Sequence, residues 1–127
     1  MSIERTRPIR ILVVDDDAEY LRLMNLFLHR NGHTVLLANS GQEAEEHAEG
    51  VDLALIDMIM PELSGLETIA LLQGRNPKLK IIASSGCFES DFRAELDRLG
   101  VETFLQKPFA PERLLEQINL LISGASV

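Results

Sequence analysis

Short apolar segments and helix-forming stretches alternate five times along this chain, and the alternation limits the fold more than any other feature. The apolar segments are predicted strands at residues 10–15, 34–38, 53–57, 80–84 and 103–106. The helical stretches that follow them are predicted at residues 18–30, 41–49, 65–74, 90–99 and 111–122. Such β-α repeats are typical of a parallel sheet, and strands that are apolar on both faces indicate helices on both sides. The sequence therefore predicts an α/β fold with a doubly wound, five-stranded parallel sheet.

Several helix boundaries carry local signals of their own. Ser40 with Glu43, and Ser64 with Glu67, fit the capping box, in which a hydroxyl and an acid satisfy the first free backbone amides. The pair Asn31-Gly32 is a good stop for the first helix because both residue types tolerate positive φ. These signals predict where the second and third helices begin and where the first one ends.

The composition is that of one ordinary globular domain. We expect a single domain over residues 1–127, with a core at about 9–122 and short polar tails, because 127 residues with 46% hydrophobic content can bury a true core. The formal net charge of −8 argues against direct nucleic-acid binding, which depends on clustered Lys and Arg. Cys87 is the only cysteine, so no internal disulfide can form. A single cysteine is typical of a reducing, cytoplasmic setting, which is the expected location. The sequence shows no signal peptide or run of transmembrane length, so no membrane contact is expected.

Acidic residues stand at the ends of two predicted strands. Asp15 and Asp16 follow the apolar run at 11–14, and Asp57 follows the run at 53–56. Because parallel strands joined by right-handed crossovers all end on the same edge of their sheet, these carboxylates should lie close together. Like charges so close need a cation, a proton or a phosphoryl group beside them.

A purely structural role is the alternative for these acids. Aspartate is favoured at helix N-termini, so Asp15 and Asp16 could simply cap the helix that follows. Capping needs only one acid, however, and Asp17 is the better candidate for that role. Asp57 could likewise be an inert turn residue, but the apolar strand before it and Pro61 after it disfavour that alternative.

Two further functional groups end predicted strands at the same edge, because Ser85 follows the fourth strand and Lys107 follows the fifth. Two or three carboxylates with a backbone carbonyl and waters suit Mg²⁺, a hard cation that prefers oxygen ligands. A carboxylate such as Asp57 can attack phosphorus, with the metal neutralising the developing charge. Lys107 and the Ser85 hydroxyl could then bind the remaining phosphoryl oxygens.

Five motifs occur in an order and at a spacing that are found together in one family. They are Ile11-Leu12-Val13-Val14-Asp15-Asp16, Asp57-Met58-Ile59-Met60-Pro61, Ser64-Gly65-Leu66-Glu67, Ser85-Gly86 and Phe104-Leu105-Gln106-Lys107-Pro108-Phe109. Each motif is weak alone, whereas the set is specific. Over roughly residues 9–122 the chain resembles the receiver domain of bacterial two-component response regulators, which implies a flavodoxin-like (βα)5 fold.

The resemblance implies that Asp57 accepts a phosphoryl group from a histidine kinase or a histidine phosphotransfer protein. Asp16 would bind Mg²⁺ directly, and Asp15 would assist mostly through water. The main-chain carbonyl of Ile59 would complete the ligands that the protein supplies. The chain would then work as a switch in a phosphorelay.

The resemblance also implies how the switch operates. Ser85 and Lys107 would contact the phosphoryl oxygens, and the Lys107-Pro108 bond is cis in this family. Phe104 fills the aromatic switch position, which rotates inward as Ser85 moves toward the phosphate. Static packing is the alternative for Phe104, since an aromatic residue in a short strand is usually core. The phosphate would bias a pre-existing two-state equilibrium, so the chain is expected to signal and not to be an enzyme.

Two residues beside the expected site are expected to affect how quickly the aspartyl phosphate is hydrolysed. Ile59 and Cys87 stand two residues after Asp57 and Ser85, at positions that tune self-hydrolysis in this family. Neither side chain can readily orient an attacking water. The sequence therefore predicts a slow loss of phosphate.

Two rival functions match the sequence less well. A Mg²⁺-dependent phosphohydrolase of the haloacid dehalogenase type also uses an aspartyl nucleophile, but it places a second Asp two residues later, where this chain has Ile59. A pseudo-receiver would keep the fold without being phosphorylated. That reading is disfavoured because every chemical position of the site is present.

The partners downstream of the switch stay open. The chain could be a stand-alone receiver or a piece of a larger regulator or hybrid kinase, acting on an output domain or protein. A homodimer through the fourth helix, fifth strand and fifth helix is possible, although the charges there could equally form a solvated face: Asp91, Glu95, Arg98, Arg113 and Glu116. Leu26 points away from the core stripe of the first helix, either as a lone exposed leucine or as a contact for a partner.

Overall fold

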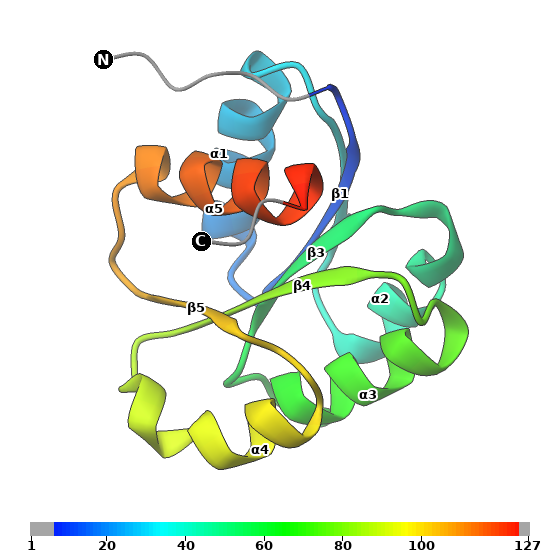
Figure 1. Cartoon of the computed structure of the whole chain (residues 1–127), viewed down its shortest axis with the longest axis vertical. Helices are drawn as coiled ribbons and strands as arrows, with labels where there is room; N and C mark the ends of the chain where they lie inside the picture. The colour runs from blue at the N-terminus through cyan, green and yellow to red at the C-terminus, as the bar shows by residue number, and fades with distance from the viewer. Residues whose placement is uncertain (1–6, 125–127) are drawn as a thin grey trace.

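A computed structural model describes residues 7–124, and a five-stranded parallel sheet forms its centre. The strands are β1 (Arg10–Val14), β2 (Thr34–Ala38), β3 (Leu53–Asp57), β4 (Lys80–Ser85) and β5 (Thr103–Gln106). Their order across the sheet is β2-β1-β3-β4-β5, with every neighbouring pair parallel (Figure 1). The predicted α/β fold is confirmed, and each strand lies within one residue of its predicted bounds. The expected polar tails at 1–6 and 125–127 lie outside the described residues.

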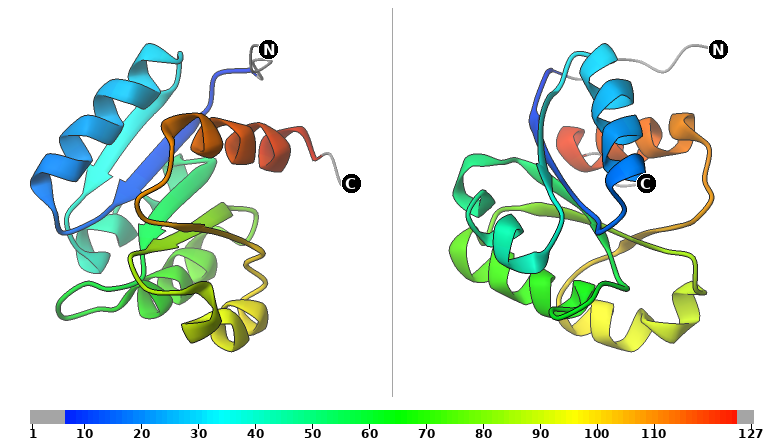
Figure 2. Two further views of the ribbon diagram at one scale, coloured as in Figure 1. Left: turned by 90° about the vertical axis from the view of Figure 1, so that its left-hand side faces the viewer. Right: turned by 180° about the vertical axis from the view of Figure 1, so that it is seen from behind.

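Helices cover both faces of the sheet. They are α1 (Ala18–Arg30), α2 (Gly41–Glu45), α3 (Gly65–Arg75), α4 (Arg93–Arg98) and α5 (Pro111–Ser123). Helices α1 and α5 lie on one face, and α2, α3 and α4 lie on the other (Figure 2). No helix within residues 7–124 is long and apolar enough to cross a membrane.

The core is divided into two apolar clusters by the sheet, because side chains alternate between the two faces of a strand. On β1, Ile11 and Val13 pack in the cluster that contains α1 and α5, whereas Leu12 and Val14 pack in the cluster with α2, α3 and α4. All four side chains are fully or almost fully buried. The inner strands are therefore held from both sides, which fixes the position of the residues that follow them.

Two predicted helices differ from the observed ones. The helix predicted over 41–49 ends at Glu45 and is followed by a separate 3₁₀ turn, Ala48–Gly50. The Asn76 side-chain amide donates to the carbonyls of Ala48 and Val51, and these bonds attach the 3₁₀ turn and the residue after it to the end of α3.

The fourth helix is the second difference. A 3₁₀ turn, η2 (Glu89–Asp91), replaces the predicted first helical turn, and α4 begins only at Arg93. Neither η2 nor α4 has a side-chain cap at its N-terminus. The guanidinium of Arg93 ties the two together, since it pairs with Glu89 at 2.7 Å and with Asp97 at 2.9 Å.

Strand β2 is less buried than its apolar sequence predicts. It lies at the edge of the sheet and pairs only with β1. Thr34 is exposed, and the three residues after it are only half-buried. The apolar side chains of β2 therefore pack against α1 and α2, but they are not buried completely as they would be in an inner strand.

Capping follows the sequence prediction at one helix and differs at another. At α3, the Ser64 hydroxyl accepts from the Glu67 N–H, and the Glu67 carboxylate accepts from the Ser64 N–H, which completes the predicted box. At α2, Ser40 accepts from the Glu43 N–H as predicted. The Glu43 carboxylate, however, accepts from the Asn39 N–H at 2.7 Å, one residue before the predicted donor.

Helix α1 has side-chain and backbone signals at both ends. The Asp17 carboxylate accepts from the N–H groups of Glu19 and Tyr20, so Asp17 has the structural role predicted for it. At the other end Asn31 keeps a negative φ, and Gly32 takes the positive φ of 91°. Glycine adopts that conformation without a steric cost, which explains the stop.

The start of α3 lies unusually close to the end of β3. A Cβ on Gly65 would meet the Asp57 carbonyl oxygen and the Met58 Cα at 2.4 Å each. The Gly65 N–H donates to the Met58 carbonyl at 3.0 Å, which fixes the approach. Only glycine fits between the helix and the residue that ends β3.

We expect Gly65→Ala to destabilise the fold by about 1–3 kcal/mol, because the added methyl group must push rigid backbone apart. Gly74→Ala in the same helix is the matched control, since a Cβ there meets nothing within 4 Å. That control should gain about 0.5–1 kcal/mol from its higher helix propensity. Urea unfolding followed by circular dichroism measures both, and equal stability of the two variants would contradict the close packing.

Candidate functional site

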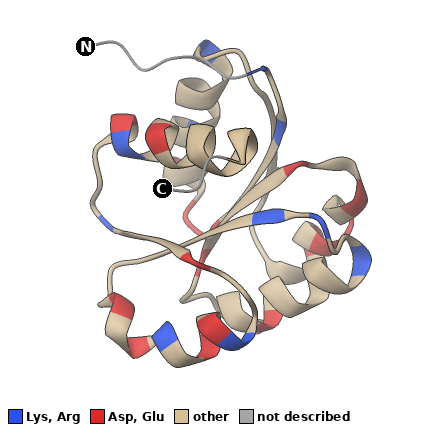
Figure 3. Ribbon diagram, viewed as in Figure 1, with Lys and Arg blue, Asp and Glu red and all other residues tan. Residues whose placement is uncertain are grey.

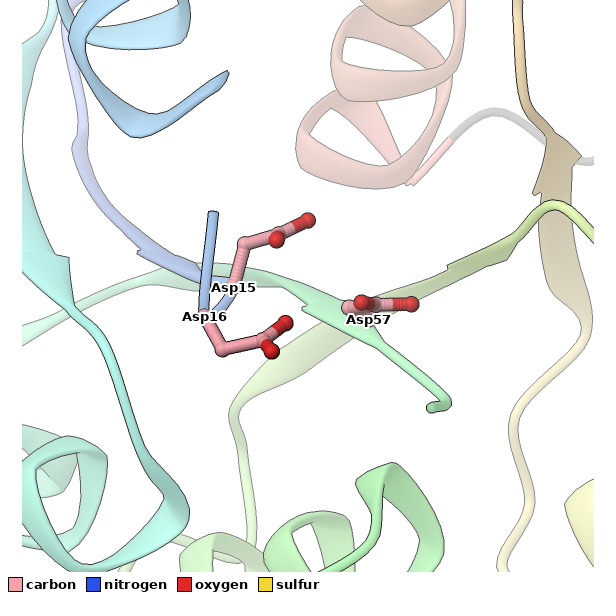
Figure 4. A group of neighbouring side chains, drawn as sticks. All are labelled: Asp15, Asp16 and Asp57. Carbon is pink, nitrogen blue, oxygen red and sulfur yellow. The ribbon is translucent and has the colours of Figure 1, made fainter. Parts of the chain in front are cut away.

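Three carboxylates meet where β1 and β3 end. Asp15 and Asp16 directly follow β1, and Asp57 is the last residue of β3. One oxygen from each of the three lies within 4.8 Å of the other two (Figure 4). The carboxylates predicted to converge at this edge of the sheet are thus brought together.

Each carboxylate has a different environment. Asp15 is buried, and its Oδ1 accepts from the Asp17 N–H at 2.9 Å. Asp57 is partly buried, and its Oδ1 accepts from the Ile59 N–H at 3.3 Å. Asp16 is exposed. The cluster is therefore anchored at Asp15 and open to solvent at Asp16.

Lys107 brings a positive charge to this cluster. Its Nζ lies 2.5 Å from Asp15 Oδ2 and 4.0 Å from Asp57 Oδ2. The backbone N–H of Lys107 donates to the Ser85 carbonyl at 2.8 Å, and the peptide bond to Pro108 is cis, as the family resemblance implied. In this structure the ammonium is thus paired with Asp15 more closely than with Asp57.

The surroundings of Asp57 raise the pKa of its carboxyl group, so its ionised form is less favourable than that of a free aspartate. Burial is the largest influence and raises the pKa of its carboxyl, and the nearby Asp15 and Asp16 carboxylates raise it further. The Lys107 ammonium and the Ile59 N–H oppose that shift without cancelling it. One lysine is therefore too little positive charge to offset burial and two neighbouring acids.

The residues present fit a hard divalent cation. All three side chains offer carboxylate oxygens, which is the donor type that Mg²⁺ prefers. The raised pKa of Asp57 indicates negative charge that a further cation beside it would stabilise. The open side at Asp16 leaves room for the waters that Mg²⁺ usually keeps.

Ser85 and Phe104 lie beyond the carboxylates on β4 and β5. Asp57 is paired in register with Ser84, so Ser85 stands one residue past it at the same edge. The buried Ser85 hydroxyl accepts from the Cys87 N–H at 3.0 Å. The half-buried Phe104 ring stacks on Phe92, with centroids 6.2 Å apart. Phe104 thus faces α4 and packs against the core on that side.

Exposed apolar side chains flank the site. Ile59 is 56% exposed in the loop after β3, and Cys87 is exposed in the loop after β4. Neighbouring Phe88 is 67% exposed. Leu26 on α1 is also exposed, in agreement with its predicted direction away from the core stripe.

Sequence reasoning missed one residue of the site, Tyr20. Its ring lies under the Lys107 ammonium, with 4.0 Å from Nζ to the ring centroid. The available signal was its position in the first helical turn after the acidic residues, which places it near the end of β1. An aromatic side chain at that point of a helix more often indicates core packing.

Known proteins match this chain closely. The response regulator receiver domain matches residues 11–119. The response regulator MprA of Mycolicibacterium vanbaalenii is 34% identical over 117 residues, which are 91% of this chain and 51% of that protein. A cyclic di-GMP phosphodiesterase of Thermotoga maritima is 29% identical over 109 residues, which are 86% of this chain and 30% of that protein.

Solved structures show the same arrangement. A response regulator receiver domain protein from Methanospirillum hungatei superposes with a TM-score of 0.87 at 28% identity, covering 93% of this chain and 96% of that one. The chain thus matches nearly all of that receiver, whereas it spans about half or less of the curated relatives described above.

The raised pKa of Asp57 predicts that Asp57→Asn stabilises the metal-free protein at neutral pH. The folded state holds the Asp57 proton more tightly than the unfolded state does, so stability falls as pH rises through the folded pKa. The gain from Asp57→Asn should therefore be full at neutral pH and vanish below the ordinary value of 3.8, where both states are protonated.

Thermal unfolding in the presence of EDTA, repeated between about pH 3 and pH 7.5, measures this dependence. Asp91→Asn is the control, because it removes an exposed carboxylate from η2, away from the cluster. A gain for Asp57→Asn that stays constant across the range would contradict the electrostatic explanation.

Proposed function

The chain belongs to the response regulator receiver domain family, and on that premise we propose that Asp57 accepts a phosphoryl group from a phosphohistidine donor. The observation that carries the proposal is the cluster of Asp15, Asp16 and Asp57 with Lys107 beside it. The donor would be a histidine kinase or a histidine phosphotransfer protein. Residues 1–127 would act as a single receiver domain with its core at about 9–122.

The transfer is a displacement at phosphorus. A carboxylate oxygen of Asp57 attacks, the new P–O bond forms, and the P–N bond to the donor imidazole breaks. The imidazole leaves with the bonding electron pair and is neutral once it has a single ring proton. The Ile59 N–H, which donates to Asp57 Oδ1 at 3.3 Å, holds the carboxylate in place.

Asp16, Asp57 and the main-chain carbonyl of Ile59 would hold Mg²⁺, with Asp15 assisting through water. When bound, Mg²⁺ would supply positive charge to neutralise the charge that develops on the transferring phosphoryl group. Asp15 also has a second task, because its Oδ2 already pairs with Lys107 at 2.5 Å. That pairing keeps the ammonium within reach of the group that Asp57 would receive.

Ser85 and Lys107 would bind the phosphoryl oxygens after transfer. The Ser85 hydroxyl accepts from the Cys87 N–H, so its own proton is free to be donated to a phosphoryl oxygen. Lys107 would move from Asp15 toward the new negative charge. Both contacts exist only when the phosphate is present, and they would shift the equilibrium toward the active arrangement.

Phe104 would transmit the change to the surface of α4, β5 and α5. It leaves its stack on Phe92 as Ser85 moves toward the phosphate. A pocket of about 350 Å³ lies on this face, lined in part by Phe104, Phe109 and Arg113. Rotation of the Phe104 ring would therefore reshape a surface that a partner can contact.

Receiver domains are signalling domains, and the longer relatives suggest how the signal is used. One is named a response regulator and another a cyclic di-GMP phosphodiesterase, and this chain matches about half or less of each. We propose that the phosphorylated chain controls an output domain or protein and does not itself bind nucleic acid. The net charge of −8 supports that last point.

The charged surface of η2 and α4 favours a solvated face over a dimer interface. Acidic and basic residues are interspersed along this segment (Figure 3). Arg93 is paired with Glu89 and Asp97 inside the segment, so these charges need no second copy of the chain. A homodimer through α4, β5 and α5 is the alternative use of this surface.

Acetyl phosphate with Mg²⁺ is expected to add one phosphoryl group to the wild-type chain and none to Asp57→Asn. The reason is that Asp57 is the proposed nucleophile, and an amide cannot replace it. Intact-mass spectrometry measures the adduct, and Asp91→Asn is a matched control that should be labelled like the wild type. Absence of the adduct in the wild type, or its persistence in Asp57→Asn, would overturn the proposal.

The phosphorylated chain should lose its phosphate slowly, because neither exposed Ile59 nor exposed Cys87 can orient an attacking water. The double variant Ile59→Asn with Cys87→Glu should shorten the phosphate half-life by at least about tenfold. Phe88→Glu is the control, since it places the same acid one residue further along the loop and should leave the half-life near that of the wild type. A half-life unchanged in the double variant would contradict this explanation.

A further inference from the structure

Three groups surround the Lys107 ammonium: the Asp15 carboxylate at 2.5 Å, the Asp57 carboxylate at 4.0 Å, and the ring of Tyr20. The two carboxylates belong to the site already described. The ring has no part in it so far, although its centroid is only 4.0 Å from Nζ. Tyr20 is the only tyrosine in the chain.

The position of Tyr20 is set by the backbone that also carries the acids. Tyr20 lies in the first turn of α1, where its N–H donates to the capping carboxylate of Asp17. Its side chain is half-buried against the apolar cluster under α1 and α5. The ring is therefore held firmly at the end of β1, and it does not depend on Lys107 for its place.

The position of the Lys107 ammonium is not fixed by its own side chain. A lysine side chain has four flexible methylene groups and a point charge that can reach any nearby acid. The carboxylates of Asp15 and Asp57 compete for this ammonium. A close ion pair with Asp57 would occupy a carboxylate oxygen that the proposed transfer needs. A cation over an aromatic face is stabilised by the ring, more so when both are withdrawn from water.

We propose that Tyr20 is a positioning residue whose ring holds the Lys107 ammonium on Asp15 and so keeps the Asp57 carboxylate free to react. The proposal rests on the function proposed for Asp57. It assigns the effect to the aromatic face and not to the hydroxyl group. The hydroxyl is buried and has no hydrogen-bond partner among residues 7–124.

The state of the phenol agrees with this assignment. Burial, followed by the charges of Asp15 and Asp57, raises the pKa of Tyr20 far above its ordinary value. The ring therefore stays neutral at physiological pH, and its contact with the ammonium does not rely on a phenolate. Removal of the hydroxyl should leave the contact in place and should not reduce stability, because no hydrogen bond is lost.

The first test compares phosphorylation rates with acetyl phosphate and Mg²⁺. Tyr20→Leu keeps an apolar side chain but removes the ring, and its rate should fall about tenfold. Tyr20→Phe keeps the ring and should restore the rate to within about twofold of the wild type. Phe27→Leu, a matched loss of a half-buried ring on the same helix, should leave the rate unchanged. A normal rate in Tyr20→Leu, or a tenfold loss in Tyr20→Phe, would overturn the proposal.

The second test uses the unphosphorylated protein and is independent of the proposed function. The chain has three lysines, so ¹³C-labelled lysine gives a simple NMR spectrum in which Lys107→Arg identifies the Lys107 signals. The ring current of Tyr20 should shift the Lys107 ε-protons upfield in the wild type and in Tyr20→Phe. That shift should disappear in Tyr20→Leu.

The two tests separate the possible failures. If the wild type takes up no phosphoryl group, the proposed function fails, whereas the NMR shift still decides whether the ring holds Lys107. An upfield shift that persists in Tyr20→Leu, or is absent from the wild type, would overturn the positioning role whatever the phosphorylation assay shows.

Discussion

Carboxylates within 4.8 Å of one another repel, and here the backbone of β1 and β3 holds Asp15, Asp16 and Asp57 at that distance. The strands cannot separate to relieve the repulsion, because their side chains are buried in apolar clusters on both faces of the sheet. Compensation must therefore come from added positive charge. Lys107 supplies one unit of it, and the raised pKa of Asp57 shows that more is needed. The stability of the sheet thus maintains a cluster of carboxylates that further positive charge would stabilise.

The two faces of the sheet make different contributions to this site. The face with α1 and α5 brings Tyr20 beneath the Lys107 ammonium, so the positive charge of the site is contacted from this face. The opposite face brings α3 against the end of β3, where Gly65 allows contact with the backbone of Asp57 and Met58. The Lys107 ammonium and the Asp57 backbone are therefore contacted from separate layers of the protein. A substitution in one layer can alter one of them while leaving the other in place.

Much of this arrangement could be predicted from the sequence, because it follows from periodicity and from strand direction. Parallel strands end on one edge, and that rule alone brought Asp15 and Asp57 together. The features that could not be predicted depend on contacts between segments that are far apart in the sequence. The 3₁₀ turn that replaces the end of the predicted second helix is bonded to Asn76, which donates to the Ala48 carbonyl 28 residues away in the sequence. The contact between Tyr20 and Lys107 also joins opposite ends of the chain, and neither residue signals it locally. The motif order predicted which acids and bases meet, but it carried no information on which acid Lys107 contacts most closely.

The helices beside the site differ in how firmly their first turns are fixed. Helix α3 begins with a complete capping box at Ser64 and Glu67, and it follows a glycine contact that leaves no free space. On the other side of Asp57, η2 and α4 begin without any side-chain cap, and α4 has only six residues. The first turn of α3 is therefore fixed by more local contacts than the first turns of η2 and α4. Local opening at η2 and α4 should therefore cost less free energy than opening at α3, which would make α4 the surface that changes more readily when the end of β3 is modified.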